Sequence, residues 1–199
     1  MYSKNIETTK FYEKDAVDRT IDNVLKTIDG ELSQSDLNKV AVAASVESGI
    51  SRYRTQASGM SLQALESEEH DSSRLSAHLV EKFGARPPRV HAHAIVAGKH
   101  KLCAPLRLAM AMLKVRIDDV DNGCWLPESS AATPHPAMPS APPHSRIHRF
   151  NYYSWISSKL TPVRRSEGLF RTNLKLIAKD LYTGSFPEYV MLPKGVKTA

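Results

Sequence analysis

The stretch HAHAIV, His91 to Val96, decides which fold we expect for this chain of 199 residues. It follows ARPPRV, whose two prolines disfavour a helix, and it precedes Gly98. Residues 90–98 therefore predict a short strand. Side chains two positions apart on a strand share one face, so His91 and His93 are expected to point the same way.

A second histidine pair lies downstream, in a segment at residues 144–160 that predicts an amphipathic helix. His144 and His148 are four residues apart, which places them on one helical face. Asn122 lies between the two pairs, in DDVDNGCWLP, where Asn-Gly predicts a turn. Neutral imidazoles bind divalent cations well, so a strand, a loop and a helix that converge here predict a metal site. Each piece alone is more typical of packing, of surface or of an ordinary turn.

The rest of the chain is predicted to be mainly helical. The apolar spacing and the capping residues predict further helices at 13–29, 33–50, 72–84, 104–117 and 166–184. A second short strand is expected within 118–127. Residues 51–72 are polar and suit a linker, and the segment 128–143, rich in Pro, Ala and Ser, predicts a mobile loop.

Charge divides the chain into two parts. Residues 1–83 hold 10 basic and 14 acidic side chains, a net charge of −4, whereas residues 84–199 hold 17 basic and 7 acidic ones, a net charge of +10. Such asymmetry predicts two functional parts, and the basic part suits a partner that carries phosphates. A basic surface without a polyanionic partner fits the charge equally well.

Several protein classes find no support in the sequence. No apolar run is long enough for a transmembrane helix, and no signal-peptide pattern is visible, although export without a cleaved signal stays open. Cys103 and Cys124 suit two half-buried thiols better than a disulfide framework or a zinc knuckle. Glycine-rich nucleotide-binding motifs and the G-x-S-x-G hydrolase motif are also missing.

Four motifs in order carry a resemblance to a known family. They are AH-IV, a predicted helix with Arg107 and Leu108, RIDDVDNGCWLP, and HSRIH followed by tyrosines and WI--KL. Over about residues 85–165 this order resembles the AHH nucleases of the His-Me finger (HNH/endonuclease VII) superfamily. That resemblance implies an α+β fold, mostly helical, with a small ββα-metal core. It also implies a nuclease domain at 76–199, preceded by a helical delivery or adaptor segment at 1–75.

The resemblance assigns roles to individual residues. His93 matches the first histidine of the AHH motif, a metal ligand, and Asn122 matches the asparagine that orients the base or holds the loop. His144 and His148 match the histidines of the finger helix, which complete the metal or phosphate site. A divalent cation is implied, with Mg²⁺, Mn²⁺ and Zn²⁺ left open. Ala94 stands where the second histidine, the general base, is expected.

Three explanations of Ala94 are open at this point. The first is an introduced His→Ala change that inactivates a toxic nuclease. In the second, a natural variant uses His91 as the base, from the same face as His93. The third is a degenerate nuclease fold reused for binding.

Other polar and aromatic side chains have two interpretations each. Lys99, Lys101, Arg146 and Arg149 suit backbone phosphates, or they form a solvated basic face. Asp118, Asp119 and Asp121 suggest a cation site, but the family pattern favours a loop-capping segment. The aromatic residues suit base stacking, although their spacing favours core positions: Trp125, Tyr152, Tyr153 and Trp155.

The expected function is that of a metal-dependent endonuclease, with DNA favoured over RNA, acting as an antibacterial toxin. This resemblance implies a secretion-system effector, type VI among them, that is delivered into the cytoplasm of a target cell. An acidic immunity protein is the expected partner, since it would cover a basic cleft. Residues 1–75 would contact an adaptor or secretion protein, and no membrane is involved. The alternatives are a non-catalytic nucleic-acid-binding or scaffold protein, and a phage or mobile-element endonuclease.

Overall fold

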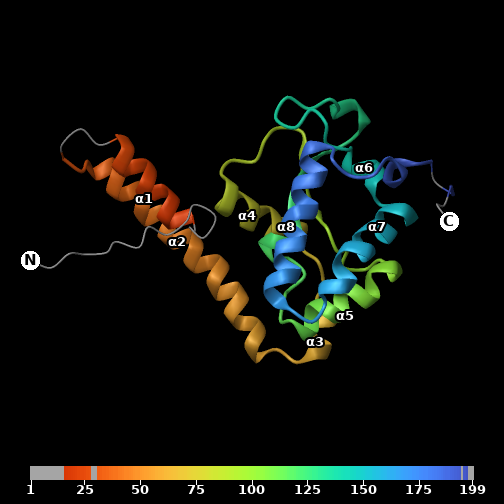
Figure 1. Cartoon of the computed structure of the whole chain (residues 1–199). Helices are drawn as coiled ribbons and strands as arrows, with labels where there is room; N and C mark the ends of the chain where they lie inside the picture. The colour runs from red at the N-terminus through yellow and green to blue at the C-terminus, as the bar shows by residue number, and fades with distance from the viewer. Residues whose placement is uncertain (1–15, 28–30, 194, 197–199) are drawn as a thin grey trace, which may run out of the picture. The chain divides into compact units, whose positions relative to one another are not determined.

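The computed structural model of the chain describes residues 16–27, 31–193 and 195–196 (Figure 1). It divides into two compact units, residues 1–49 and 50–199. The first unit contains α1 (Ala16–Thr27) and most of α2 (Gln34–Gln56), which confirms both predicted N-terminal helices over their described residues. Among the described residues, no helix is long and apolar enough to span a bilayer.

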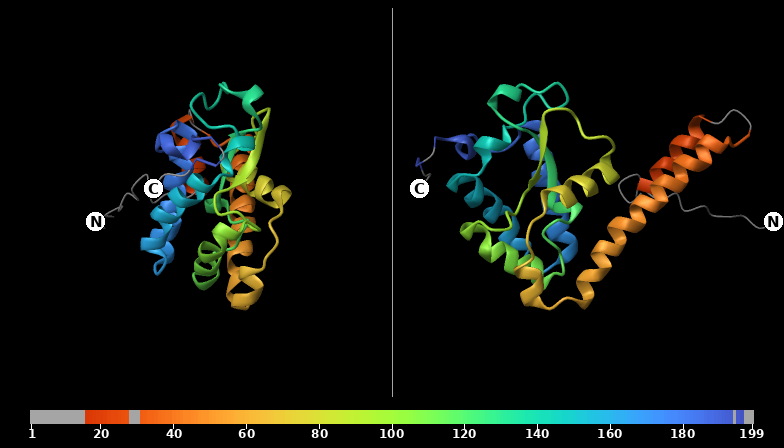
Figure 2. Two further views of the ribbon diagram at one scale, coloured as in Figure 1. Left: turned by 90° about the vertical axis from the view of Figure 1, so that its right-hand side faces the viewer. Right: turned by 180° about the vertical axis from the view of Figure 1, so that it is seen from behind.

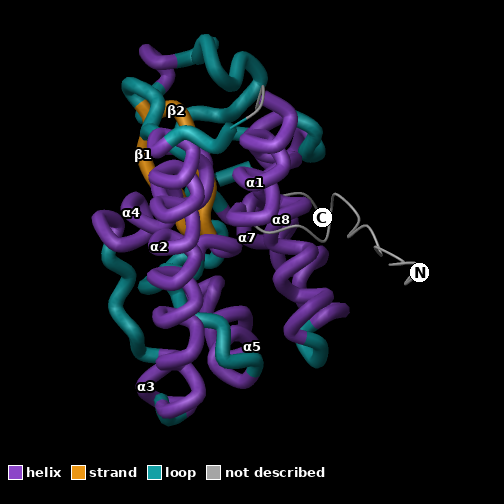
Figure 3. Tube along the Cα trace, turned by 90° about the vertical axis from the view of Figure 1, so that its left-hand side faces the viewer, coloured by secondary structure: helices purple, strands orange, loops and turns teal. Residues whose placement is uncertain are grey.

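The second unit combines helices with one small sheet, and this confirms the predicted α+β class. Strands β1 (Val90–Ala94) and β2 (Gly123–Pro127) pair antiparallel, with Val90 opposite Pro127 and Ala94 opposite Gly123. Figure 3 shows this pair lying among the helices. The helices of this unit are α3 (Leu62–Glu66), α4 (Ser72–Phe83), α5 (Ala104–Met112), α6 (His144–Ile147), α7 (Phe150–Leu160) and α8 (Glu167–Thr183).

The pair of strands, called the hairpin below although α5 lies between β1 and β2 in the chain, is held by close packing of α4 on its strands. A side chain at Gly123 would bring its Cβ to 2.6 Å from Leu75 Cδ1 of α4, so only glycine fits there without a shift. Leu75 and Leu126 are both fully buried. The Asn-Gly pair therefore serves a close helix–strand approach as well as the predicted turn.

The helix predicted over 144–160 is two helices. It breaks at His148, whose φ of −72° and ψ of 73° leave the helical region, and α7 starts after Arg149. Tyr152 and Trp155 of α7 are buried, in agreement with the core positions predicted for the aromatic residues. Figure 2 shows α7 and α8 from two further sides, and α8 ends at Thr183, followed by Gly184 in the left-handed conformation.

The linker predicted at 51–72 is wrong. These residues form the end of α2, a 3₁₀ turn at Ala57–Gly59 and α3. Ala57 and Leu65 are buried and pack with Ala111 of α5, so the segment contributes to the core of the second unit. The boundary between the two compact units accordingly lies between Gly49 and Ile50. A separate function for residues 1–75 stays a prediction.

The segment 128–143 has no long element, as predicted, but it is anchored to the rest of the unit. It forms a 3₁₀ turn at Ser130–Ala132 and an isolated bridge between His135 and Met138, both of them buried. Nε2 of His135 lies 2.8 Å from the carbonyl oxygen of Pro88. In both views of Figure 2 this green-to-teal segment forms the upper end of the unit.

Two of the three clustered aspartates connect separate elements instead of forming an open cation site. Asp119 and Asp121 are buried, and both accept hydrogen bonds from Arg54 at the end of α2. Arg171 of α8 donates to the same two carboxylates, at 2.8 and 3.2 Å. The acidic segment is thus satisfied by cationic side chains of this chain.

Candidate metal centre and nuclease site

The hairpin delivers His93 into the interior of the second unit. His93 is fully buried, whereas His91, two positions earlier, is exposed. Both rings nevertheless contact the ring of His144, with centroid distances of 5.3 Å for His91 and 5.4 Å for His93. The shared strand face predicted for the pair is therefore present.

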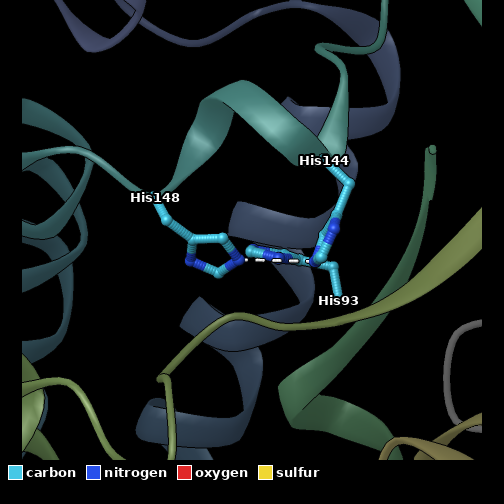
Figure 4. Close-up of side chains that lie close together, drawn as sticks. All are labelled: His93, His144 and His148. Atoms are coloured by element: carbon cyan, nitrogen blue, oxygen red, sulfur yellow. Dashed lines mark hydrogen bonds between the residues drawn. The ribbon is translucent and has the colours of Figure 1, made fainter. Parts of the chain in front are cut away.

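Helix α6 brings the second pair to the same place. Ile147 is fully buried and fixes this single turn, so His144 and His148 both project toward His93 (Figure 4). One nitrogen atom from each of the three rings lies within 4.8 Å of the others. The strand and the helical turn thus meet as the sequence predicted.

The separation within the helical pair fits a bound cation. Nε2 of His144 and Nε2 of His148 are 3.3 Å apart. Two imidazole nitrogens bonded at about 2.05 Å to one tetrahedral ion would lie roughly 3.3 Å apart. Imidazole donors suit transition-metal cations such as Zn²⁺, while the phosphate oxygens of a substrate suit Mg²⁺ and Mn²⁺.

Tyr152 fixes which nitrogen of His93 faces its partners. The Tyr152 hydroxyl donates to the carbonyl oxygen of Ile95 at 2.9 Å, so its single proton is committed. It therefore accepts a hydrogen bond from Nε2 of His93, at 2.8 Å. Nδ1 of His93 then carries the lone pair, and it is buried without a hydrogen-bond partner. A buried nitrogen that has a lone pair and no hydrogen-bond partner is suited to bind a cation.

The surroundings hold all three imidazoles in their neutral, ligating form. Burial lowers the pKa of His93 well below its usual range, and the neighbouring His148 and His144 lower it further. Burial, with the nearby His148 and His91, lowers the pKa of His144 to about 4. The pKa of His148 is lowered by burial and by His100. Near neutral pH, protons therefore do not compete with a cation for these nitrogens.

Asn122 holds the chain that follows β1. Its Oδ1 accepts from the backbone N–H of Val96 at 2.8 Å, and its Nδ2 donates to the carbonyl oxygens of Val96 and Ile117. Asn122 is completely buried, and its three hydrogen bonds satisfy the amide. Of the two predicted roles, holding the loop is the one that these contacts fit.

A cleft of about 810 Å³ opens beside the triad. Ala94 lines it together with His144 and His148, so the position of the expected base faces the space where a substrate would lie. A methyl group cannot accept a proton. The remaining lining residues are His70, Ser72, Ser73, Ser76, Arg86, His91, Ala92, Ala97, Gly98, Lys99 and His100.

The four predicted phosphate-binding side chains differ in their surroundings. Lys101 and Arg146 are exposed, and Lys99 lines the cleft but pairs with Glu69 at 2.8 Å. Nη1 of Arg149 donates to the carbonyl oxygens of Met191 and Leu192, which ties it to the C-terminal segment. Their part in nucleic-acid binding stays a prediction.

Sequence reasoning missed two cleft residues, Arg86 and His70. Arg86 lies over the ring of Trp125, with its guanidinium carbon 5.6 Å from the ring centroid, and donates to the carbonyl oxygen of Val90. His70 lies outside every recognised motif and bonds to Asp118, 48 residues further along the chain. The sequence carries no local signal for either contact.

Comparison with known proteins places this geometry in a class. Residues 76–181 match a family described as a nuclease family of the HNH/ENDO VII superfamily with conserved AHH. The match covers more than half of the chain, so the protein is a nuclease of that superfamily, with nucleic acid as its class of substrate. Within the superfamily it belongs to the AHH family, as the sequence motifs predicted. No curated protein and no solved structure matches the chain.

Proposed function

We propose that this protein is a metal-dependent endonuclease that hydrolyses phosphodiester bonds, with DNA as its substrate. The observation that supports this most is the convergence of three neutral imidazoles, His93, His144 and His148, at the edge of a cleft. A divalent cation bound there would stabilise the charge that develops on the scissile phosphate and on the leaving oxygen.

The chain's own residues set up this chemistry. Tyr152 and Ile95 hold His93 in one tautomer, and Tyr153 lies 3.0 Å from Nδ1 of His148, which leaves Nε2 of His148 facing His144. Arg86 and Lys99 supply positive charge at the cleft, where a polyanionic backbone would lie. These contacts pre-organise the ligands before a substrate arrives.

The test is cleavage of supercoiled plasmid by the purified chain with Mg²⁺ or Mn²⁺, with and without a chelator. Cleavage should require the cation and should fall at least a hundredfold in His144→Ala, which removes a half-buried ligand. The control is Lys159→Ala, which changes an exposed side chain near the C-terminal end of α7. Cleavage that persists in the chelator and in His144→Ala would contradict the proposal. Parallel reactions with RNA show whether DNA or RNA is the preferred substrate.

Ala94 favours one second candidate, a nucleic-acid-binding protein without catalysis. Without a base, the site would bind a backbone and release it uncut. Two measurements separate the candidates: strong nucleic-acid binding with no cleavage by either the wild type or Ala94→His supports the binding protein. Cleavage by Ala94→His alone supports a site inactivated at position 94.

We also propose that the nuclease acts as an antibacterial toxin with an acidic immunity partner. The resemblance to effector nucleases and the net charge of +10 in residues 84–199 support this role. Expression in bacteria should arrest growth, and His93→Ala should relieve the arrest. Equal growth with both chains would contradict the toxin role, and would favour a phage or mobile-element endonuclease if cleavage is nevertheless measured.

A further inference from the structure

We propose that His70, oriented by Asp118, is the general base of this nuclease, in place of the histidine missing at position 94. This inference rests on the proposed nuclease function and adds the residue that activates water. His70 lies six residues before the segment that matches the family, so the family motif does not assign it a role.

His70 faces the same cleft as the cation ligands. It lines the cleft together with Ala94, His144 and His148. Its backbone lies against the loop after β1, because a side chain at Gly98 would have its Cβ 2.7 Å from Cβ of His70.

The His70–Asp118 pair has the geometry of an oriented base. Nδ1 of His70 donates to Oδ1 of Asp118 at 2.5 Å, which leaves Nε2 as the nitrogen with a lone pair. Asp118 is completely buried, and its Oδ2 accepts from the backbone N–H of Asp71 at 3.0 Å and from Arg74 at 3.2 Å. A carboxylate fixed on both oxygens holds the imidazole in one tautomer and one orientation, and it stabilises the imidazolium that forms when a proton is taken up.

The other two histidines of the cleft are less suited to this role. His91 is exposed, and among the described residues no carboxylate is in hydrogen-bond contact with its ring. His100 uses Nδ1 to accept from the backbone N–H of Leu102 and stacks on Tyr153 at 4.0 Å between ring centroids. Of the three, only His70 combines a half-exposed ring with a buried carboxylate partner.

The proposed reaction consumes one water molecule and needs no other co-reactant. Nε2 of His70 takes a proton from a water molecule while the water oxygen forms a bond to phosphorus. The bond between phosphorus and the leaving sugar oxygen breaks, and that oxygen takes up a proton from solvent. His70 then returns its proton to solvent, so the net change is hydrolysis of one phosphodiester to a phosphomonoester and an alcohol.

The experiment compares plasmid cleavage with Mg²⁺ by the full chain and by the variants His70→Gln, His91→Gln and His135→Gln. His135 is the matched control, because it is a buried histidine whose Nε2 lies 2.8 Å from the carbonyl oxygen of Pro88 and it does not line the cleft. Melting temperature and Mn²⁺ affinity are measured for each variant, so that loss of fold or of the cation site is separated from loss of the base.

We expect His70→Gln to lower the cleavage rate by about a hundredfold or more while Mn²⁺ affinity is unchanged. Added imidazole should restore part of the activity of His70→Ala, because it can replace the missing base, whereas it would not repair a purely structural defect. Imidazole should not stimulate the wild type, and it should not remove Mg²⁺ from the reaction, because Mg²⁺ prefers oxygen ligands. His135→Gln should cleave within a few-fold of the wild type, and His91→Gln, whose ring contacts the ligand His144, should lose less activity than His70→Gln.

Wild-type rates in His70→Gln, or a loss confined to His91→Gln, would overturn the inference and leave the nuclease function intact. A wild-type chain that is inactive while Ala94→His cleaves would also overturn it, since the site would then lack a base. Inactivity of both the wild type and Ala94→His would instead refute the proposed nuclease function.

Discussion

Gly98 provides the space that His70 occupies beside the cleft. A Cβ at this position would lie 2.7 Å from Cβ of His70 and 3.4 Å from its backbone nitrogen, so one of the two segments must move. Displacing His70 by even about an ångström would misalign it with a water molecule in the cleft. The glycine therefore matters through a neighbour that is distant in sequence.

Gly98→Ala should reduce cleavage about tenfold or more and lower the free energy of unfolding by roughly 1–2 kcal/mol, the usual cost of overpacking. Gly59→Ala is the control, because a Cβ there would meet nothing within 4 Å. Steady-state cleavage and urea unfolding measure the two effects. Full activity in Gly98→Ala would contradict the placement of His70.

His144 makes the stability of the metal-free protein depend on pH. Burial, together with His148 and His91, lowers its pKa from 6.5 to about 4. Between these values the unfolded chain binds a proton that the folded chain does not bind, so stability falls as the pH drops through this window. The melting temperature in chelator should decrease from pH 6.5 to 4, and less steeply in His144→Gln. Equal slopes for the two chains would show that His144 is not buried as described.

Asn122 links the two strands of the hairpin to the chain on either side of it. Its amide makes three hydrogen bonds, to both backbone groups of Val96 and to the carbonyl of Ile117. Asn122→Ala leaves these buried groups unsatisfied, and we expect the free energy of unfolding to fall by about 3 kcal/mol. The control Asn173→Ala removes only a bond to Leu169 within α8. Urea unfolding that does not distinguish the two variants would contradict the role assigned to Asn122.

The strand HAHAIV and the helical pair His144/His148 could be predicted because their signals are local. Alternation and a spacing of four residues determine which side chains share a face. The break in the helix after His148 could not be predicted from the sequence, because no proline or glycine marks it. Arg149 is held there by a carbonyl group 42 residues further along the chain. His70 was missed for the same reason, because its carboxylate partner is distant in the sequence.

On the scale of the molecule, the second compact unit is larger than the region that matches the family. Arg54, at the end of α2, pairs with the buried Asp119, and Tyr53 is buried against the same part of the unit. Breaking a buried ion pair costs about 3–5 kcal/mol, a large part of the stability of a domain of this size. The residues between 50 and 75 are therefore structural parts of the nuclease.

A chain that starts at Ser45, with one helical turn to spare, should fold and cleave at the full-length rate. A chain that starts at residue 76, where the family match begins, should unfold at a much lower temperature and lack cleavage, because it loses Arg54 and His70. Circular dichroism and plasmid cleavage measure both. A fully active chain of residues 76–199 would contradict this division of the molecule.

His93, His144 and His148 are proposed to share one cation. Calorimetric titration of Mn²⁺ into the wild type and His144→Ala tests it most directly, at neutral pH where the imidazoles are unprotonated. We expect one binding site in the wild type and an affinity at least tenfold lower in the variant, with Mn²⁺ raising the melting temperature of the wild type more than that of the variant. Equal affinities for the two chains would contradict it.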